Sequence, residues 1–259
     1  MKTAIVDLKE GFKRFGLSAT LAWEDLKDRY RRSVLGLLWI IIAFLTFVLV
    51  MLLIFGRIFD AEGFDYTTHL VVGFAVFGFI SSLIPGSGDV FAVNKAWILS
   101  TNLPYSVYAN ALVLKSFFEL AIVGATAALL VIFLGNPNPG HLWTIIPALA
   151  LYYLTALGLC FAIGPIGTRY RDFVYLLQSV TRMLFFATPV FWVATPDTSR
   201  GLISMYNPAT YFLDIIRLPI NEGRVSMTAW MICGLCCLGL WVIGFISFSV
   251  SKRKIALWL

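Results

Sequence analysis

Six runs of apolar residues, each long enough to cross a lipid bilayer, constrain this chain more than any other feature. A helix needs about 20 apolar residues to span the hydrocarbon core. Backbone groups in lipid must also find their hydrogen bonds within the protein, and a helix provides them internally. We therefore predict an all-α, polytopic membrane protein with a single domain over residues 1–259. The six predicted transmembrane helices cover residues 34–56, 70–91, 105–134, 142–165, 173–194 and 227–250.

Composition agrees with a membrane protein and argues against a water-soluble enzyme or a disordered chain. Hydrophobic residues make up 59% of the 259 residues and charged residues only 13%. An ordinary soluble domain has about 45–50% apolar and about 25% charged residues. The cysteines lie in apolar runs with no His or acid nearby, so we interpret them as small apolar side chains. They are Cys160, Cys233, Cys236 and Cys237.

The distribution of positive charge predicts the orientation of the chain. Loops on the cytoplasmic side of a membrane carry an excess of Lys and Arg. With the N-terminus in the cytoplasm, fourteen of the 20 Lys and Arg fall on the inner side and four on the outer side. We therefore predict that both termini are cytoplasmic, which agrees with an even number of spans. The four outer residues are Arg57, Arg200, Arg217 and Arg224.

Two segments before the third span have the pattern of interfacial helices. In residues 1–32, apolar residues recur at three- and four-residue steps with charges between them, which predicts an amphipathic helix in the membrane interface. That helix serves either as a surface anchor only or as a docking surface for a cytoplasmic partner. Residues 94–103 are short and mildly amphipathic, and Pro104 can redirect the chain after them. We predict a second short interfacial helix there.

Residues 195–226 are too long for a turn and too apolar for a free loop. Their most apolar part is interrupted by Asp214 and Arg217 and is too short to span. Asn207 and Pro208 predict a tight turn before a helical run. We expect a re-entrant or interfacial helical hairpin on the outer side, which is a candidate gate.

The chain lacks the sequence motifs that ATP hydrolysis, nucleophilic catalysis or metal binding would require. It has no phosphate-binding G-x-x-x-x-G-K-[ST] loop, no Ser/His/Asp arrangement and no metal-ligand spacing. We therefore predict no catalytic residue and no metal site. Lys115 and Glu119 are four residues apart in the third span and are expected to pair with each other. Acids in the spans lie toward the cytoplasmic end, which makes proton-coupled transport a minor alternative.

Aromatic side chains line the first and fifth predicted spans along their length. Packing against lipid explains such side chains without further function. A pore wall also explains them, because flat aromatic faces let sugar rings slide past without trapping them. The candidate channel-lining residues are Phe44, Phe47, Phe55, Tyr175, Phe185, Phe186, Phe191 and Trp192.

Three stretches in order resemble type-2 ABC permeases that export polysaccharides such as O-antigen, capsule and teichoic acid. The first is Arg29-Tyr-Arg-Arg-Ser-Val-Leu-Gly-Leu-Leu-Trp39, and the second runs from Arg171 to Trp192. The third is Tyr206-Asn-Pro-Ala-Thr with the later Arg217. The resemblance covers essentially the whole chain. One departure is the first cytoplasmic loop, where only Lys95 is basic and many members carry a basic stretch containing Phe-Pro.

The resemblance implies the partners that the chain lacks. It implies a homodimer in the bacterial inner membrane that binds two ABC ATPase subunits, which carry ATP and Mg, and moves lipid-linked polysaccharide, with no nucleic acid involved. The chain itself would be no enzyme and would hold no cofactor. The implied ATPase-docking residues are Trp23, Asp28, Arg29, Arg31, Arg32, Lys95 and Trp97. The implied inner mouth is Arg169, Arg171 and Asp172, and the implied outer gate is Tyr206, Asn207, Pro208 and Arg217. In this scheme residues 94–103 are the coupling helix and residues 195–226 the outer gate segment.

Two alternatives stay open at this stage. The first is a type-2 ABC permease for another cargo, such as a lipo-oligosaccharide or a drug. The second is an integral membrane acyltransferase, which is disfavoured because no His/Asp/Glu pair lies at a membrane face.

Overall fold

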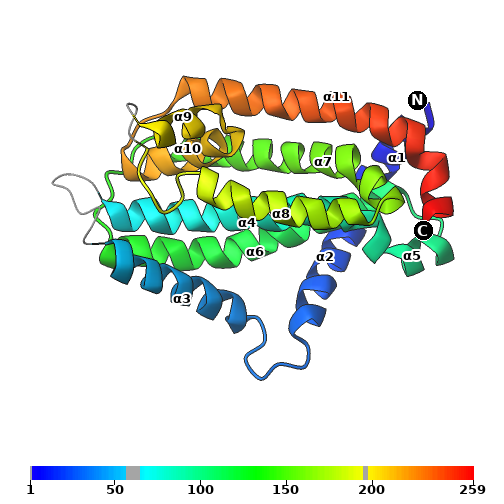
Figure 1. The fold of residues 1–259 in the computed structure, drawn as a ribbon. Helices are drawn as coiled ribbons and strands as arrows, with labels where there is room; N and C mark the ends of the chain where they lie inside the picture. Colours follow the sequence, from blue (N-terminus) through cyan, green and yellow to red (C-terminus); the bar gives the residue numbers. More distant parts are fainter. Residues whose placement is uncertain (1, 57–64, 195–197) are drawn as a thin grey trace.

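The computed structural model describes residues 2–56, 65–194 and 198–259, and these form an all-helical bundle (Figure 1). The predicted all-α class is therefore confirmed. The helices are α1 (Lys2–Lys13), α2 (Phe15–Tyr30), α3 (Leu38–Phe55), α4 (Tyr66–Val93), α5 (Lys95–Ser100), α6 (Tyr105–Leu134), the short 3₁₀ helix η1 (Leu142–Thr144), α7 (Ile145–Arg169), α8 (Asp172–Ala187), α9 (Ser199–Tyr206), α10 (Pro208–Asn221) and α11 (Met227–Trp258).

Five segments of the described chain are long and apolar enough to cross a membrane. They are Leu38–Phe55, Tyr66–Ser100, Tyr105–Leu134, Leu142–Arg169 and Met227–Trp258. The fifth predicted span, residues 173–194, corresponds to α8, which has 16 residues and ends at Ala187. That is short of the about 20 residues needed to span, so the predicted number of six is not confirmed. α8 nevertheless packs along α4 and α7 in the bundle (Figure 1).

Local sequence signals set the ends of several helices. The Asp65 carboxylate accepts a hydrogen bond from the Thr68 amide at 3.0 Å and caps α4. The Ser226 hydroxyl caps α11 in the same way, at 3.2 Å from the Ala229 amide. These caps satisfy amide groups that the first helical turn leaves unpaired. Gly36 has a φ of +53° in the turn between α2 and α3, a backbone conformation that favours glycine.

Two helices organise the core of the bundle. α4 packs against α3, α6, α7, α8 and α10, and α7 packs along α11. The α7–α11 contact is close because glycines face each other there: a Cβ on Gly244 would lie 2.7 Å from the Gly158 carbonyl oxygen. Small residues at such contacts let membrane helices approach closely. The core therefore depends on glycine at this crossing.

The N-terminal segment is two helices where one was predicted. The helix is interrupted at Arg14, which lies between α1 and α2. α1 packs on α6 and α11, and α2 packs on α6. Ala4, Ala22 and Leu26 are buried against the bundle, whereas Phe12 and Phe15 stay exposed. Some larger apolar side chains of this segment, such as Phe12 and Phe15, thus face away from the bundle, whereas Leu26 packs into it.

The two ends of the bundle differ in what they carry. Both termini, α1 and α5 lie at one end, and α9 and α10 lie at the other (Figure 1). α5 falls where the sequence predicts a short helix, although it covers only six residues. α9 and α10 meet at Asn207 and Pro208, where the turn was expected. The predicted partner-facing and outer segments therefore occupy opposite ends.

Candidate functional site

The end of the bundle that holds both termini is joined around one buried carboxylate, Asp7. Its residue exposure is 4%. The carboxylate accepts hydrogen bonds from the Ser106 amide at 3.0 Å and the Tyr105 amide at 3.2 Å, which begin α6. It also lies 2.9 Å from the Lys252 ammonium of α11. We call Asp7, Tyr105, Ser106 and Lys252 the Asp7 hub, and it joins α1, α6 and α11.

Further close contacts surround the Asp7 hub, and α5 is joined to it through the short link before α6. The Ser106 hydroxyl donates to the Asp7 carbonyl at 2.7 Å. Gly11 lies against Ser106 so closely that any side chain there would collide with it. The Lys95 ammonium of α5 donates to the Leu259 carbonyl after α11. Sequence reasoning missed Asp7, although an acid between Val6 and Leu8 on the apolar side of a helix is a usable signal.

Two ion pairs hold α2 against α6. Arg29 Nη1 lies 2.9 Å from Glu119 Oε1, and Lys115 Nζ lies 3.8 Å from Asp25 Oδ2. The predicted pairing of Lys115 with Glu119 is therefore wrong: each side chain finds its partner on another helix. Spacing of four residues on both helices produces two matched pairs of opposite charge. These four residues fix α2 along the N-terminal half of α6.

The predicted ATPase-docking residues are exposed but occupy two separate places. Trp23, on α2, meets Phe118 edge-on with ring centres 5.6 Å apart. Arg31 lies 3.5 Å from Asp28, and both side chains are mostly exposed, as is Arg32. Lys95 and Trp97 are exposed on α5. In Figure 1 the end of α2 leads away from the bundle, whereas α5 lies at the end beside the C-terminus.

The predicted channel-lining aromatics fall into three groups by exposure. Phe44 and Trp192 are buried at 5% exposure each, while Tyr175 and Phe186 are 66% and 68% exposed. Phe47, Phe55, Phe185 and Phe191 are partly buried. The exposed pair is thus the part of the set that a passing molecule can reach.

Phe185 is the centre of an aromatic cluster within the chain. Its ring centre lies 5.3 Å from that of Phe77 and 5.4 Å from that of Phe191. Phe47 meets it edge-on at 6.0 Å and stacks on Phe74 at 3.9 Å. Such pairs stabilise beyond their buried area by about 0.5–1.5 kcal/mol each. This cluster joins α3 and α8 to α4.

At the opposite end, a buried arginine ties the segment after α8 to α4 and α10. The Arg217 guanidinium donates to the Pro189 carbonyl at 2.7 Å and to Asp214 at 2.8 Å. It lies 3.2 Å from the His69 ring, which in turn lies 3.2 Å from the Trp192 carbonyl. Arg217 links these segments through its hydrogen bonds, and its role as a gate residue stays a prediction.

The other predicted gate residues have different environments. Asn207 donates to the Thr188 hydroxyl at 2.8 Å and also caps α10. Pro208 begins α10, and Tyr206 is strongly exposed. At the end of this segment the Glu222 carboxylate hydrogen-bonds Arg224 at 2.5 Å, which raises the pKa of the Arg224 guanidinium. Of the four predicted gate residues, Asn207 and Arg217 thus make side-chain hydrogen bonds to the segment after α8.

The predicted inner-mouth residues have different environments. The Arg169 guanidinium lies over the Tyr170 and Trp258 rings, 5.1 and 5.4 Å from their centres. Arg171 and Asp172 are exposed at the start of α8. Among the residues that the structure describes, no group of three or more His, Cys, Asp or Glu could hold a metal ion.

Comparison with known proteins places these features in a family. The sequence model of the ABC-2 type transporter family matches residues 17–220. An "O-antigen export system permease protein RfbA" from Klebsiella pneumoniae is 24% identical over 246 residues, which covers 93% of this chain and 94% of that protein. A protein of the same name from Myxococcus xanthus is 23% identical over 222 residues, covering 84% and 85%.

Proposed function

The chain belongs to the ABC-2 type transporter family, and we propose that it forms the transmembrane channel of an ATP-driven exporter of lipid-linked polysaccharide in the bacterial inner membrane. The observation that carries this proposal is the similarity to O-antigen export permeases, which extends over 84–93% of the chain. As a permease, the chain is a transport subunit and not itself an enzyme. O-antigen-like polymer is the cargo that this similarity favours over a drug or a lipo-oligosaccharide.

The proposed complex contains two copies of this chain and two ATPase subunits that bind ATP and Mg. Exposed aromatic and arginine side chains on α2 and the exposed Trp97 on α5 support interfaces at these two helices, because aromatic residues and Arg are enriched where proteins associate. α5 covers only six residues and buries none of them within the chain. Apart from Ile98, which packs against the core, and Lys95, which bonds Leu259, its side chains are therefore open to a partner.

Movement of α5 would reach the rest of the bundle through the Asp7 hub. The hub joins the start of α6 to α1 and α11, so a push on α5 would move these helices together. α3 and α8 would then line the path, with Tyr175 and Phe186 as its exposed aromatic side chains. Sugar rings stack on such side chains without being held at one point. Breaking the Arg217–Pro189 hydrogen bond would release the outer segment.

Deleting the gene and following the polymer tests this function. We expect lipid-linked polysaccharide to accumulate on the cytoplasmic side and surface polymer to disappear. The intact chain should restore export, and a cognate ATPase should co-purify with it. Surface polymer that persists without the chain would refute the proposal. Accumulation of a different lipid-linked molecule would instead assign another cargo.

A further inference from the structure

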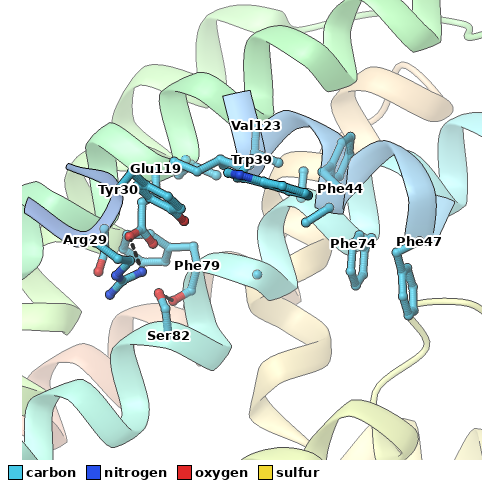
Figure 2. Close-up of a pocket in the computed structure, with 16 residues that line it drawn as sticks. Arg29, Tyr30, Trp39, Phe44, Phe47, Phe74, Phe79, Ser82, Glu119 and Val123 are labelled. Atoms are coloured by element: carbon cyan, nitrogen blue, oxygen red, sulfur yellow. Dashed lines mark hydrogen bonds and ion pairs between the residues drawn. The ribbon is translucent and has the colours of Figure 1, made fainter. Parts of the chain in front are cut away.

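A cavity of about 370 Å³ lies between α2, α3, α4 and α6 and has one charged end and one aromatic end. Figure 2 shows Arg29, Tyr30 and Glu119 together at one end, with Phe44, Phe74 and Phe47 at the other. Its volume falls in the range of about 300–1,000 Å³ that is usual for small-molecule sites. The shape of the cavity therefore suits a molecule with a polar head and an apolar tail.

The charged end offers one positive and one negative group side by side. Arg29 Nη1 lies 2.9 Å from Glu119 Oε1, and the arginine side chain is half exposed. A guanidinium has five N–H donors, so Arg29 can bind a phosphate while keeping its bond to Glu119. Glu119 disfavours a headgroup that is only negative, and Arg29 disfavours one that is only positive. A headgroup that carries both charges matches the pair.

The aromatic end is apolar and is not filled by the chain's own side chains. A Cβ built on Gly78, which lines the cavity, would meet no atom within 4 Å. α3, α4 and α6 belong to segments that can cross a membrane, so this space lies at membrane depth. The cavity is open on one side, where Gly78 is exposed, so a molecule from the bilayer can enter it. An acyl chain from the bilayer is the available filler.

From this geometry we propose that the cavity binds one phospholipid with a zwitterionic headgroup. Its phosphate binds Arg29, its primary ammonium binds Glu119, and one acyl chain packs against Phe44, Phe74 and Phe79. This lipid is not the cargo, so the site stands whether or not the chain exports polysaccharide. The bound lipid fills the cavity between α3 and α4 and so sets how closely these two helices pack.

Native mass spectrometry of the purified, detergent-solubilised chain tests the site. Phosphatidylethanolamine and phosphatidylglycerol with identical acyl chains are added at equal concentration, and the bound fractions are compared. We expect at least about tenfold preference for phosphatidylethanolamine, which corresponds to about 1.4 kcal/mol. Glu119→Gln should remove the preference, because the ammonium then loses its negative partner. Equal binding of the two lipids to the unmodified chain would overturn the proposal.

Filling the cavity gives a second, independent test. Gly78→Leu should lower phosphatidylethanolamine binding at least about tenfold, because the new side chain occupies the place of the acyl chain. Gly124→Leu is the matched control: Gly124 also faces open space, but in a different cavity, and this variant should bind normally. Ala43→Leu fills the same cavity from α3 if Gly78→Leu fails to fold.

Two results would refute the site directly. Normal binding by a folded Gly78→Leu or Ala43→Leu variant would show that the lipid lies elsewhere. Displacement of phosphatidylethanolamine by a polyprenyl phosphate at equal concentration would assign the cavity to the carrier of the cargo and not to a bilayer lipid.

Discussion

Replacing Asp7 by Asn should destabilise the end of the bundle that holds α1 and α5, because this one carboxylate on α1 also contacts α6 and α11. The carboxylate accepts two amide hydrogen bonds at 3.0 and 3.2 Å and faces Lys252 at 2.9 Å. An Asn at position 7 keeps one acceptor oxygen and turns an N–H donor toward either an amide or the ammonium. The substitution therefore replaces attraction by repulsion at one of these partners.

The expected loss can be estimated from the burial of each partner. Removing one member of a buried ion pair costs about 3–5 kcal/mol, and a hydrogen bond to a charged group contributes about 1.5–3 kcal/mol. The Lys252 side chain is 20% exposed, so water partly solvates the charge left behind. We expect a loss of about 2–4 kcal/mol, which lowers Tm by roughly 5–10 °C in a chain of this size.

Thermal unfolding in detergent, combined with hydrogen exchange, measures this effect. At least one of the Tyr105 and Ser106 amides should exchange faster in Asp7→Asn, because Asn offers one acceptor oxygen where Asp7 offers two. Glu10→Gln on the same helix is the control: the Glu10 side chain is 39% exposed and pairs with Lys13 at 3.0 Å, which lowers the pKa of the Glu10 carboxyl. That variant should unfold like the unmodified chain.

A double-mutant cycle shows whether the loss comes from the hub itself. In Asp7→Asn with Lys252→Met, the second substitution removes the stranded charge, so the double variant should lose at least about 1 kcal/mol less than the sum of the single variants. Strictly additive losses, or an unchanged Tm in Asp7→Asn, would refute the Asp7 hub as a junction of α1, α6 and α11.

Three further predictions concern the core, the outer segment and the aromatics. Gly244→Ala should cost about 1–3 kcal/mol by thermal unfolding, because its Cβ would lie 2.7 Å from a backbone oxygen, whereas Gly239→Ala on the same helix faces open space and should not destabilise. Arg217→Gln should cost about 1.5–3 kcal/mol and increase hydrogen exchange in residues 188–194, since the Pro189 carbonyl loses its donor. Phe186→Ala should lower polymer export in cells without loss of protein, but Trp192→Ala should reduce the amount of folded protein, since only Trp192 is buried.

The sequence predicts helix ends well where a helix-breaking Pro or Gly lies at the end of an apolar run. α6 covers Tyr105–Leu134, as expected, because Pro104 precedes it and Gly135 follows it. The prediction for the fifth span is wrong at its C-terminal end, because the apolar run continues beyond Ala187, where the helix ends. Pro189 cannot donate to the helical ladder, and its carbonyl is bonded by Arg217 from a distant helix. Hydropathy does not register that long-range contact.

Contacts between distant helices were the least predictable part of the candidate site. Lys115 and Glu119 satisfy the spacing rule for a local pair, yet each one pairs with α2. The rule describes an isolated helix and takes no account of a neighbouring helix with complementary charges. Aromatic residues raise the same difficulty, because Phe44 and Phe186 look alike in the sequence but only Phe186 is exposed.

Reconstitution of the chain with its cognate ATPase in proteoliposomes tests ATP-driven export most directly. The measurement follows a fluorescent lipid-linked polysaccharide as it crosses the membrane, with ATP present or absent. We predict that crossing requires this chain, the ATPase and ATP together, and that the polymer emerges chemically unchanged. Crossing by the chain alone without ATP, or ATP hydrolysis by the complete complex with no polymer crossing, would contradict the proposed function.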